Sequence, residues 1–331
     1  MLHQPNRQVN SFMKLIITVD VEGDNLWSSS TSMTTKNAHY IPRFQDLCSL
    51  HGFKPTYLVD YEMANDQIFQ EFGREMVRKG AAEIGMHLHA WNTPPLYTKR
   101  GLHHHPIYIT ELPDQIIYEK MAFMTSLLHD VFHSKPLSHR SGRWGFDERV
   151  ARVLSELGYH VDCSVTPGVS WRHHKGDPDG KGGPDYNTFS VRPYFLDLDN
   201  IRLAGEFNIL EVPVTIRPMY PKLLRRLFHI VSQSGLLSRA VEKFLKPYVW
   251  LRPTGYNVLE MNELAGWALS KNLPVMELIL HSSELMPGGS PYFPEKDDIE
   301  TLFNDLERFL AHASALRITG ATLAEYRQIC E

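Results

Sequence analysis

Short apolar runs alternate with longer amphipathic segments along nearly the whole chain, and this alternation constrains the fold more than any other feature. The helix-like segments lie at residues 39–51, 66–79, 114–132, 147–157, 258–270, 297–312 and 322–330. The strand-like runs lie at residues 14–21, 55–61, 82–89, 137–140, 159–165, 209–216 and 275–281. Strands that alternate with helices pair in parallel, because each helix returns the chain to the same edge of the sheet. Since no linker interrupts the pattern, we predict one barrel-like α/β domain over residues 14–331.

The chain is slightly acidic overall but basic in one segment. Its net charge of −4 argues against a nucleic-acid-binding protein. Between residues 217 and 252, however, eight lysines and arginines accompany a single acid, Glu242. Apolar residues at roughly helical spacing make this inserted segment amphipathic, which allows three interpretations. We favour a packed crossover helix with a solvated face over a weak contact with an anionic membrane surface and over a lid on the site.

The N-terminal residues and the cysteines indicate in which cellular compartment the protein is expected. Residues 1–13 are polar and lack the apolar core of a signal peptide, so we expect a disordered extension there. No apolar run reaches membrane-spanning length. The three cysteines lie far apart and imply no disulfide framework. We therefore expect a cytoplasmic protein, peripheral at the inner face of the membrane if the basic segment binds lipid.

Acidic residues follow the first strand-like run, and two histidines end the third. Asp20, Glu22 and Asp24 make up the acidic cluster, and His87 and His89 flank a single leucine. Because the carboxyl ends of parallel strands meet at one edge of a sheet, these side chains should converge. Three protein ligands of this kind suit a divalent metal with a free carboxylate beside it, which predicts a metal-dependent hydrolase. The alternative is a solvated turn and two ordinary buried histidines.

Three further residues lie at or near strand ends. Arg140 ends the fourth run, where its guanidinium can hold a carboxylate by a forked contact or form an ordinary surface salt bridge. Asp162 lies inside an apolar run and therefore needs a partner, for which His281 at the end of the last run is a candidate. Such a pair would fix the imidazole and raise its basicity, as a general acid requires. Otherwise Asp162 is structural and His281 caps a helix.

These motifs, in this order, resemble those of the polysaccharide deacetylase family (carbohydrate esterase family 4, the nodulation-type deacetylases). The resemblance spans residues 14–285 and is with the divergent subset that carries His-x-His in its second motif. It implies a distorted (β/α)7 barrel in a single domain. It also implies removal of acetyl groups from sugars with one divalent metal, and Zn²⁺ is the ion we expect.

The resemblance assigns the metal ligands residue by residue. A valine stands where the family has its metal-binding aspartate, so Glu22 is expected to take this role, with Asp24 as a substitute. His87 matches the first metal-binding histidine. Trp91 occupies the family's position for the second one, so His89 is expected to serve instead.

The resemblance also assigns the catalytic residues. Asp20 matches the catalytic base, and Arg140 matches the arginine that orients it. His281 matches the catalytic acid, and Asp162 matches the aspartate that tunes that acid. The residues expected to contact the substrate are Trp91, Trp144 and Ser164.

The expected reaction is hydrolysis of an acetyl group, by preference an N-acetyl group, on a sugar of a polysaccharide, lipopolysaccharide or glycan precursor. Two alternatives stay open. One is a non-catalytic carbohydrate-binding protein on the same barrel. The other is an amidohydrolase-type enzyme, which ranks lower because such enzymes carry His-x-His on their first strand and this chain carries Asp-x-Glu there.

Overall fold

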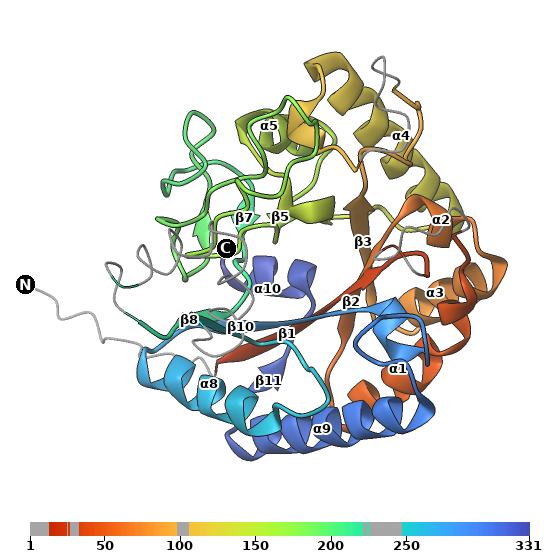
Figure 1. Cartoon of the computed structure of the whole chain (residues 1–331), viewed down its shortest axis with the longest axis vertical. Helices are drawn as coiled ribbons and strands as arrows, with labels where there is room; N and C mark the ends of the chain where they lie inside the picture. The colour runs from red at the N-terminus through yellow and green to blue at the C-terminus, as the bar shows by residue number, and fades with distance from the viewer. Residues whose placement is uncertain (1–12, 25, 27–32, 98–105, 221–223, 225–246) are drawn as a thin grey trace, which may run out of the picture.

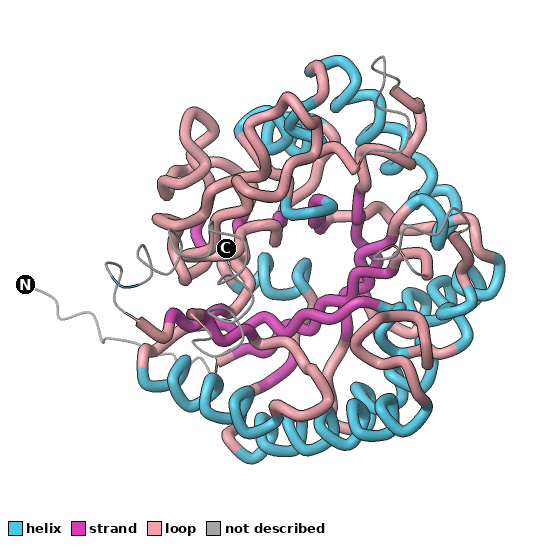
Figure 2. Tube along the Cα trace, viewed as in Figure 1, coloured by secondary structure: helices cyan, strands magenta, loops and turns pink. Residues whose placement is uncertain are grey.

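Parallel strands form a curled sheet in the computed structural model of the chain (Figures 1 and 2). The structure describes residues 13–24, 26, 33–97, 106–220, 224 and 247–331. The sheet has the order β10-β1-β2-β3-β4-β5-β7-β6, and β11 pairs with the start of β1. Its strands are β1 (Lys14–Val21), β2 (Pro55–Val59), β3 (Glu83–Leu88), β4 (Ser138–Ser141), β5 (Val161–Asp162), β6 (Tyr194–Phe195), β7 (Leu210–Glu211), β10 (Val275–His281) and β11 (Thr319–Gly320).

Helices pack around the outside of this sheet, whereas α10 (Leu323–Ile329) lies within its curl, as Figure 1 shows. The outer helices are α1 (Ile41–Leu50), α2 (Tyr61–Ala64), α3 (Gln67–Arg78), α4 (Asp114–Phe132), α5 (Glu148–Glu156), α8 (Val258–Ser270) and α9 (Lys296–Ala315). Local chemistry sets their starts: the Asp66 and Asp147 side chains accept backbone N–H groups at the first turns of α3 and α5. The predicted α/β barrel in a single domain is confirmed, as an open, curled sheet.

The expected helices are all present, whereas two expected strands are shorter than predicted. The run at 159–165 forms only the two-residue β5. The run at 209–216 divides into β7 and β8 (Ile216–Pro218), and β8 pairs with β9 (Tyr248–Trp250) in a separate antiparallel sheet. Pro213 interrupts this run because a proline has no N–H to donate to a sheet ladder.

Strand register brings the predicted residues to one end of the sheet. Asp20 on β1 lies beside His281 on β10, and His87 on β3 lies beside Arg140 on β4. At the opposite end, α10 donates backbone N–H groups to Thr56 and Glu83 near the starts of β2 and β3. The carboxyl end of the sheet is therefore the end where a site can be reached.

Two predictions fall largely outside the described residues. Residues 1–12 of the expected N-terminal extension lie outside them, and so do residues 221–223 and 225–246 of the basic segment. The ends of that segment are described, and they form β8, β9 and the residues that follow β9. Among the helices that the structure describes, none combines the length and apolar character needed to cross a membrane.

Candidate active site

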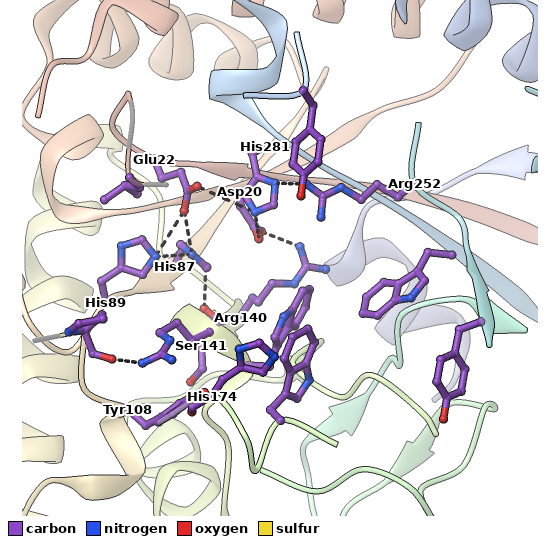
Figure 3. Close-up of a pocket in the computed structure, with 18 of the residues that line it drawn as sticks. Asp20, Glu22, His87, His89, Tyr108, Arg140, Ser141, His174, Arg252 and His281 are labelled. Atoms are coloured by element: carbon purple, nitrogen blue, oxygen red, sulfur yellow. Dashed lines mark hydrogen bonds and ion pairs between the residues drawn. The ribbon is translucent and has the colours of Figure 1, made fainter. Parts of the chain in front are cut away.

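A pocket of about 760 Å³ opens at the carboxyl ends of β1, β3, β4 and β10. This volume lies within the usual range for a small-molecule site. Figure 3 shows the polar side chains of the pocket converging from these separate strands. Those that sequence analysis had singled out and that line the pocket are Asp20, Glu22, His87, His89, Trp91, Arg140, Trp144 and His281.

Glu22, His87 and His89 form a buried cluster whose donor atoms lie within 4.8 Å of one another. The two Nε2 atoms are 2.9 Å apart, and Glu22 Oε2 lies 3.6 Å from that of His87 and 3.4 Å from that of His89. His87 Nδ1 lies 3.0 Å from the Arg140 carbonyl oxygen. Because a carbonyl oxygen can only accept, Nδ1 carries the proton and Nε2 directs its lone pair into the cluster. The cluster therefore fits a divalent cation.

The backbone of β4 lies directly against this cluster. Gly142 follows the strand, and a Cβ at this position would clash with the His89 ring and approach the Leu88 carbonyl oxygen to 2.8 Å. The indole of Trp91 also stacks on the His89 imidazole, with ring centroids 4.5 Å apart. The imidazole of His89 is thus held by contacts with both the chain after β4 and an aromatic ring.

Asp20 lies beside the cluster in a buried charge network. Arg140 Nη1 donates to Asp20 Oδ1 at 2.6 Å, and its Nη2 donates to Thr18 Oγ1 at 2.8 Å and to Glu277 Oε1. Burial opposes the Asp20 charge, but Arg140, with His87 and His281, outweighs it and lowers the pKa. Burial raises the pKa of Glu277 to about 7 despite Arg140 and Thr18. Asp20 is thus held as a carboxylate, aimed by a guanidinium.

The predicted pairing of Asp162 with His281 is wrong. Asp162 Oδ2 instead accepts from His139 Nδ1 at 2.6 Å, on the neighbouring strand. His281 Nδ1 faces Glu284 Oε2 at 3.4 Å and Arg252 Nη2 at 3.2 Å. Asp162 and His281 therefore each have other partners and do not form the predicted pair.

The imidazole of His281 lies between acids. Its Nε2 is 3.7 Å from Asp20 Oδ2 and 3.9 Å from Glu22 Oε1. Burial alone would lower the pKa of His281, but Glu22 and the hydrogen bond with Glu284 raise it above the usual value. Although burial opposes its charge, the pKa of Glu284 falls to about 2, chiefly through Arg252. Glu284, held by Arg252, is therefore a charged partner of His281 that sequence analysis did not assign.

Two further expectations differ from what the structure places at the site. Asp24 lies outside the cluster, because its carboxylate accepts from Thr34, from two backbone N–H groups and from the Asn37 amide in the loop after β1. Ser164 does not line the pocket among the described residues. Its hydroxyl donates to Asp162 and accepts the Ser141 N–H, so it links β4 to the chain after β5.

An aromatic wall completes the pocket. Trp144, Trp171 and Trp250 have ring centroids 6.1 to 6.3 Å apart, and only Trp144 was expected at the site. Trp144 has a positive φ of 64°, a strained conformation for this residue, and the Tyr186 hydroxyl donates to its carbonyl oxygen at 2.6 Å. Flat apolar rings beside polar groups suit a sugar ring, because the C–H groups on one face of the sugar can pack on an indole.

Sequence reasoning missed several pocket residues for identifiable reasons. Glu284 carried a signal, because it stands three residues after His281 and forms a capping box with it. Arg252, Trp171 and Trp250 carried none. Arg252 and Trp171 lie in irregular segments, and Trp250 ends the short strand β9, whose place in the fold no local pattern gives.

Comparison with known proteins supports the fold. No protein-family model matches the chain, and no curated protein matches it. A provisionally named polysaccharide deacetylase from Mycobacterium smegmatis has a TM-score of 0.56 and 15% identity, over 99% of this chain and 92% of its own. A provisionally named glycoside hydrolase/deacetylase from Parabacteroides distasonis has a TM-score of 0.63 and 10% identity, over 97% and 72%. At these identities the likeness establishes the fold alone.

Proposed function

We propose that this chain is a metal-dependent hydrolase that removes the acetyl group from an N-acetylated sugar. One observation carries the proposal: a buried set of one carboxylate and two imidazoles lies beside a second carboxylate, Asp20, that an arginine holds charged. Hydrolysis of an amide requires these two parts, an electrophilic centre and a base. The names of the two structural neighbours agree with this reaction class.

Glu22, His87 and His89 would hold the metal, and their donor types suit Zn²⁺. When bound, such an ion lowers the pKa of a coordinated water to about 7 and polarises a carbonyl oxygen. Three protein ligands leave room for water and substrate, as catalytic zinc sites do.

Asp20 is the proposed base. Its carboxylate is not part of the ligand set, so it is available to accept the proton of the attacking water. Arg140 keeps Oδ1 in place, which leaves Oδ2 directed toward His281 and the cluster. A fixed base spends no free energy on orientation during the reaction.

His281 is the proposed acid. Its Nε2 points toward Asp20 and Glu22, where the leaving nitrogen would lie, while its Nδ1 rests on Glu284. A charged imidazole donates the Nε2 proton to the departing amine. In this proposal Glu284, fixed by Arg252, replaces Asp162 as the residue that supports the acid.

The aromatic wall supports a sugar as the substrate. Trp144 belongs to this wall, Trp91 stacks on His89, and both line the pocket. A glycan precursor, with its acetamido group toward Glu22 and a ring face on an indole, would use both parts of this pocket. We also propose a cytoplasmic location.

The test is acetate release from a panel of N-acetylated amino sugars and their short oligomers, using zinc-supplemented protein. We expect at least one member to yield stoichiometric acetate and free amine. If every member binds but none releases acetate, the carbohydrate-binding alternative is favoured and the hydrolase proposal fails.

Replacing Glu284 with Gln should move the alkaline limb of the kcat profile to lower pH. The raised pKa of His281 keeps it protonated to higher pH, and removing the Glu284 charge removes part of that effect. The exposed Glu300→Gln variant changes the net charge equally far from the site and should leave the limb in place. An unmoved limb in Glu284→Gln would refute the assignment of His281 and Glu284.

A further inference from the structure

The guanidinium of Arg140 binds only one of the two carboxylate oxygens of Asp20. Its Nη1 donates to Oδ1 at 2.6 Å, a contact that Figure 3 draws. An arginine beside a carboxylate frequently forms a fork instead, in which two nitrogens donate to both oxygens. Here Oδ2 lies 3.7 Å from the Nε2 atom of His281, which lines the pocket. A further contact of Arg140 must therefore keep its second nitrogen away from Oδ2.

Glu277 holds that second nitrogen. Nη2 of Arg140 donates to Glu277 Oε1 and, at 2.8 Å, to Thr18 Oγ1. The Thr18 hydroxyl in turn donates to the same Oε1 at 2.9 Å, which closes a triangle of hydrogen bonds. Nε donates to the Cys163 carbonyl oxygen at 3.2 Å, so each nitrogen of the guanidinium has an acceptor. The guanidinium is thereby fixed, with Nη1 on Asp20 and Nη2 on Glu277.

Strand register places Glu277 on the correct face of the sheet and below the pocket. It lies on β10 four residues before His281, and side chains at this spacing in a strand face the same way. Thr18 and Asp20 likewise share one face of β1, and Asp20 pairs with His281 across the two strands. The Glu277 side chain is fully buried and is not part of the pocket lining among the described residues. It can therefore reach Asp20 through Arg140 but cannot touch a bound substrate.

The fold alone does not account for a carboxyl group at this position. Its Oε2 atom has no hydrogen-bond partner among the described residues, and burial raises the pKa of Glu277 to about 7 despite Arg140 and Thr18. Both features show that the buried carboxyl group costs free energy, which an apolar side chain would avoid. Whether or not the group is ionised, Oε1 can accept from Nη2. The hold on Arg140 therefore does not depend on the charge of Glu277.

We infer that Glu277 is a positioning residue, which holds Arg140 Nη2 and so leaves Asp20 Oδ2 free to accept the proton of the attacking water. This inference rests on the proposed function, in which Asp20 is the base. Without the Glu277 carboxyl group, Nη2 keeps only the neutral Thr18 hydroxyl and is free to turn to Oδ2, an ionised acceptor. A charge-assisted hydrogen bond at Oδ2 would then have to break before the base could act. The loss should fall on kcat rather than on KM, because no contact with substrate changes.

The test compares Glu277→Leu with Glu277→Gln in the zinc-loaded protein, with the acetylated sugar that the panel identifies. We expect Glu277→Leu to lower kcat by about tenfold to a hundredfold, with KM and zinc affinity unchanged. Glu277→Gln should restore kcat to within about threefold of the parent protein, because its Oε1 still accepts from Nη2.

Glu211→Leu is the matched control for this test. Glu211 is an equally buried acid on β7, and its Oε1 accepts from the Val165 N–H rather than from Arg140. The control should retain the kcat of the parent protein. Three results would overturn the inference: an unchanged kcat in Glu277→Leu, a loss that Glu277→Gln does not restore, or an equal loss in the control.

A crystal structure of metal-free Glu277→Leu keeps this test separate from that of the proposed function. We expect Arg140 to form a fork on Asp20 in this variant, with Nη2 about 3 Å from Oδ2. If no panel sugar releases acetate but the fork forms, the proposed substrate fails while the role of Glu277 stands. If Nη2 stays away from Oδ2, that role is refuted whatever the activity. Glu277→Met, with a side chain of similar length, takes the place of the leucine variant if the latter does not fold.

Discussion

Replacing Asp20 with Asn should abolish turnover while leaving the metal bound. The amide cannot accept the proton of the attacking water, so the general-base contribution, about 10²- to 10⁴-fold, is lost. Zinc affinity should persist because Asp20 is not one of the three donors of the cluster. The measurement is kcat for acetate release together with zinc content per chain.

The fold of this variant should survive, since the asparagine Oδ1 can still accept from Arg140 Nη1. Asp199→Asn, at an exposed ion pair with Arg152, is a matched control and should retain full kcat. Retention of activity in Asp20→Asn would show that another group removes the proton. Loss of zinc from it would instead place Asp20 among the ligands.

Replacing His87 and His89 together with Ala should remove the metal and, with it, the activity. Two of the three donors disappear, and the remaining carboxylate of Glu22 cannot hold the ion alone. We expect zinc affinity to fall by more than about a hundredfold, because the loss of a residue that merely supports a ligand can already lower metal affinity that much. Metal analysis after dialysis and calorimetric titration with zinc both measure this.

His174→Ala is the control for this double variant. His174 also lines the pocket but does not belong to the cluster, so zinc should still bind at one equivalent per chain. Zinc bound as tightly by the double variant as by the parent protein would show that the ion lies elsewhere. The proposed mechanism would then have no electrophilic centre.

The sequence was informative wherever topology alone fixes a position. Parallel strands end at the same edge, so residues that end apolar runs, such as Asp20, His87 and Arg140, had to converge once the strands were recognised. Side chains two residues apart in a strand face the same way, so Glu22 was expected to face the same way as Asp20, and His89 the same way as His87. These predictions required no knowledge of which strands are neighbours beyond the α/β pattern.

Partners between distant strands could not be predicted in this way. Asp162 was paired with His281 because both carried suitable chemistry, but the sheet order puts β4, and therefore His139, beside Asp162. Asp24 likewise stabilises the loop after β1, because Asn37 and its neighbours fold back onto it. The aromatic wall combines loops with short elements such as β9, and their relative placement depends on tertiary packing, as at Trp144.

The most direct test of the proposed activity is acetate release from metal-free protein titrated with zinc, using the substrate that the panel identifies. We predict no release without metal, a rise in proportion to added zinc, and a plateau at one equivalent per chain. The same titration of the His87→Ala/His89→Ala variant should stay flat. Acetate release that is complete in metal-free protein, or that zinc does not change, would contradict the assignment of a metal-dependent hydrolase.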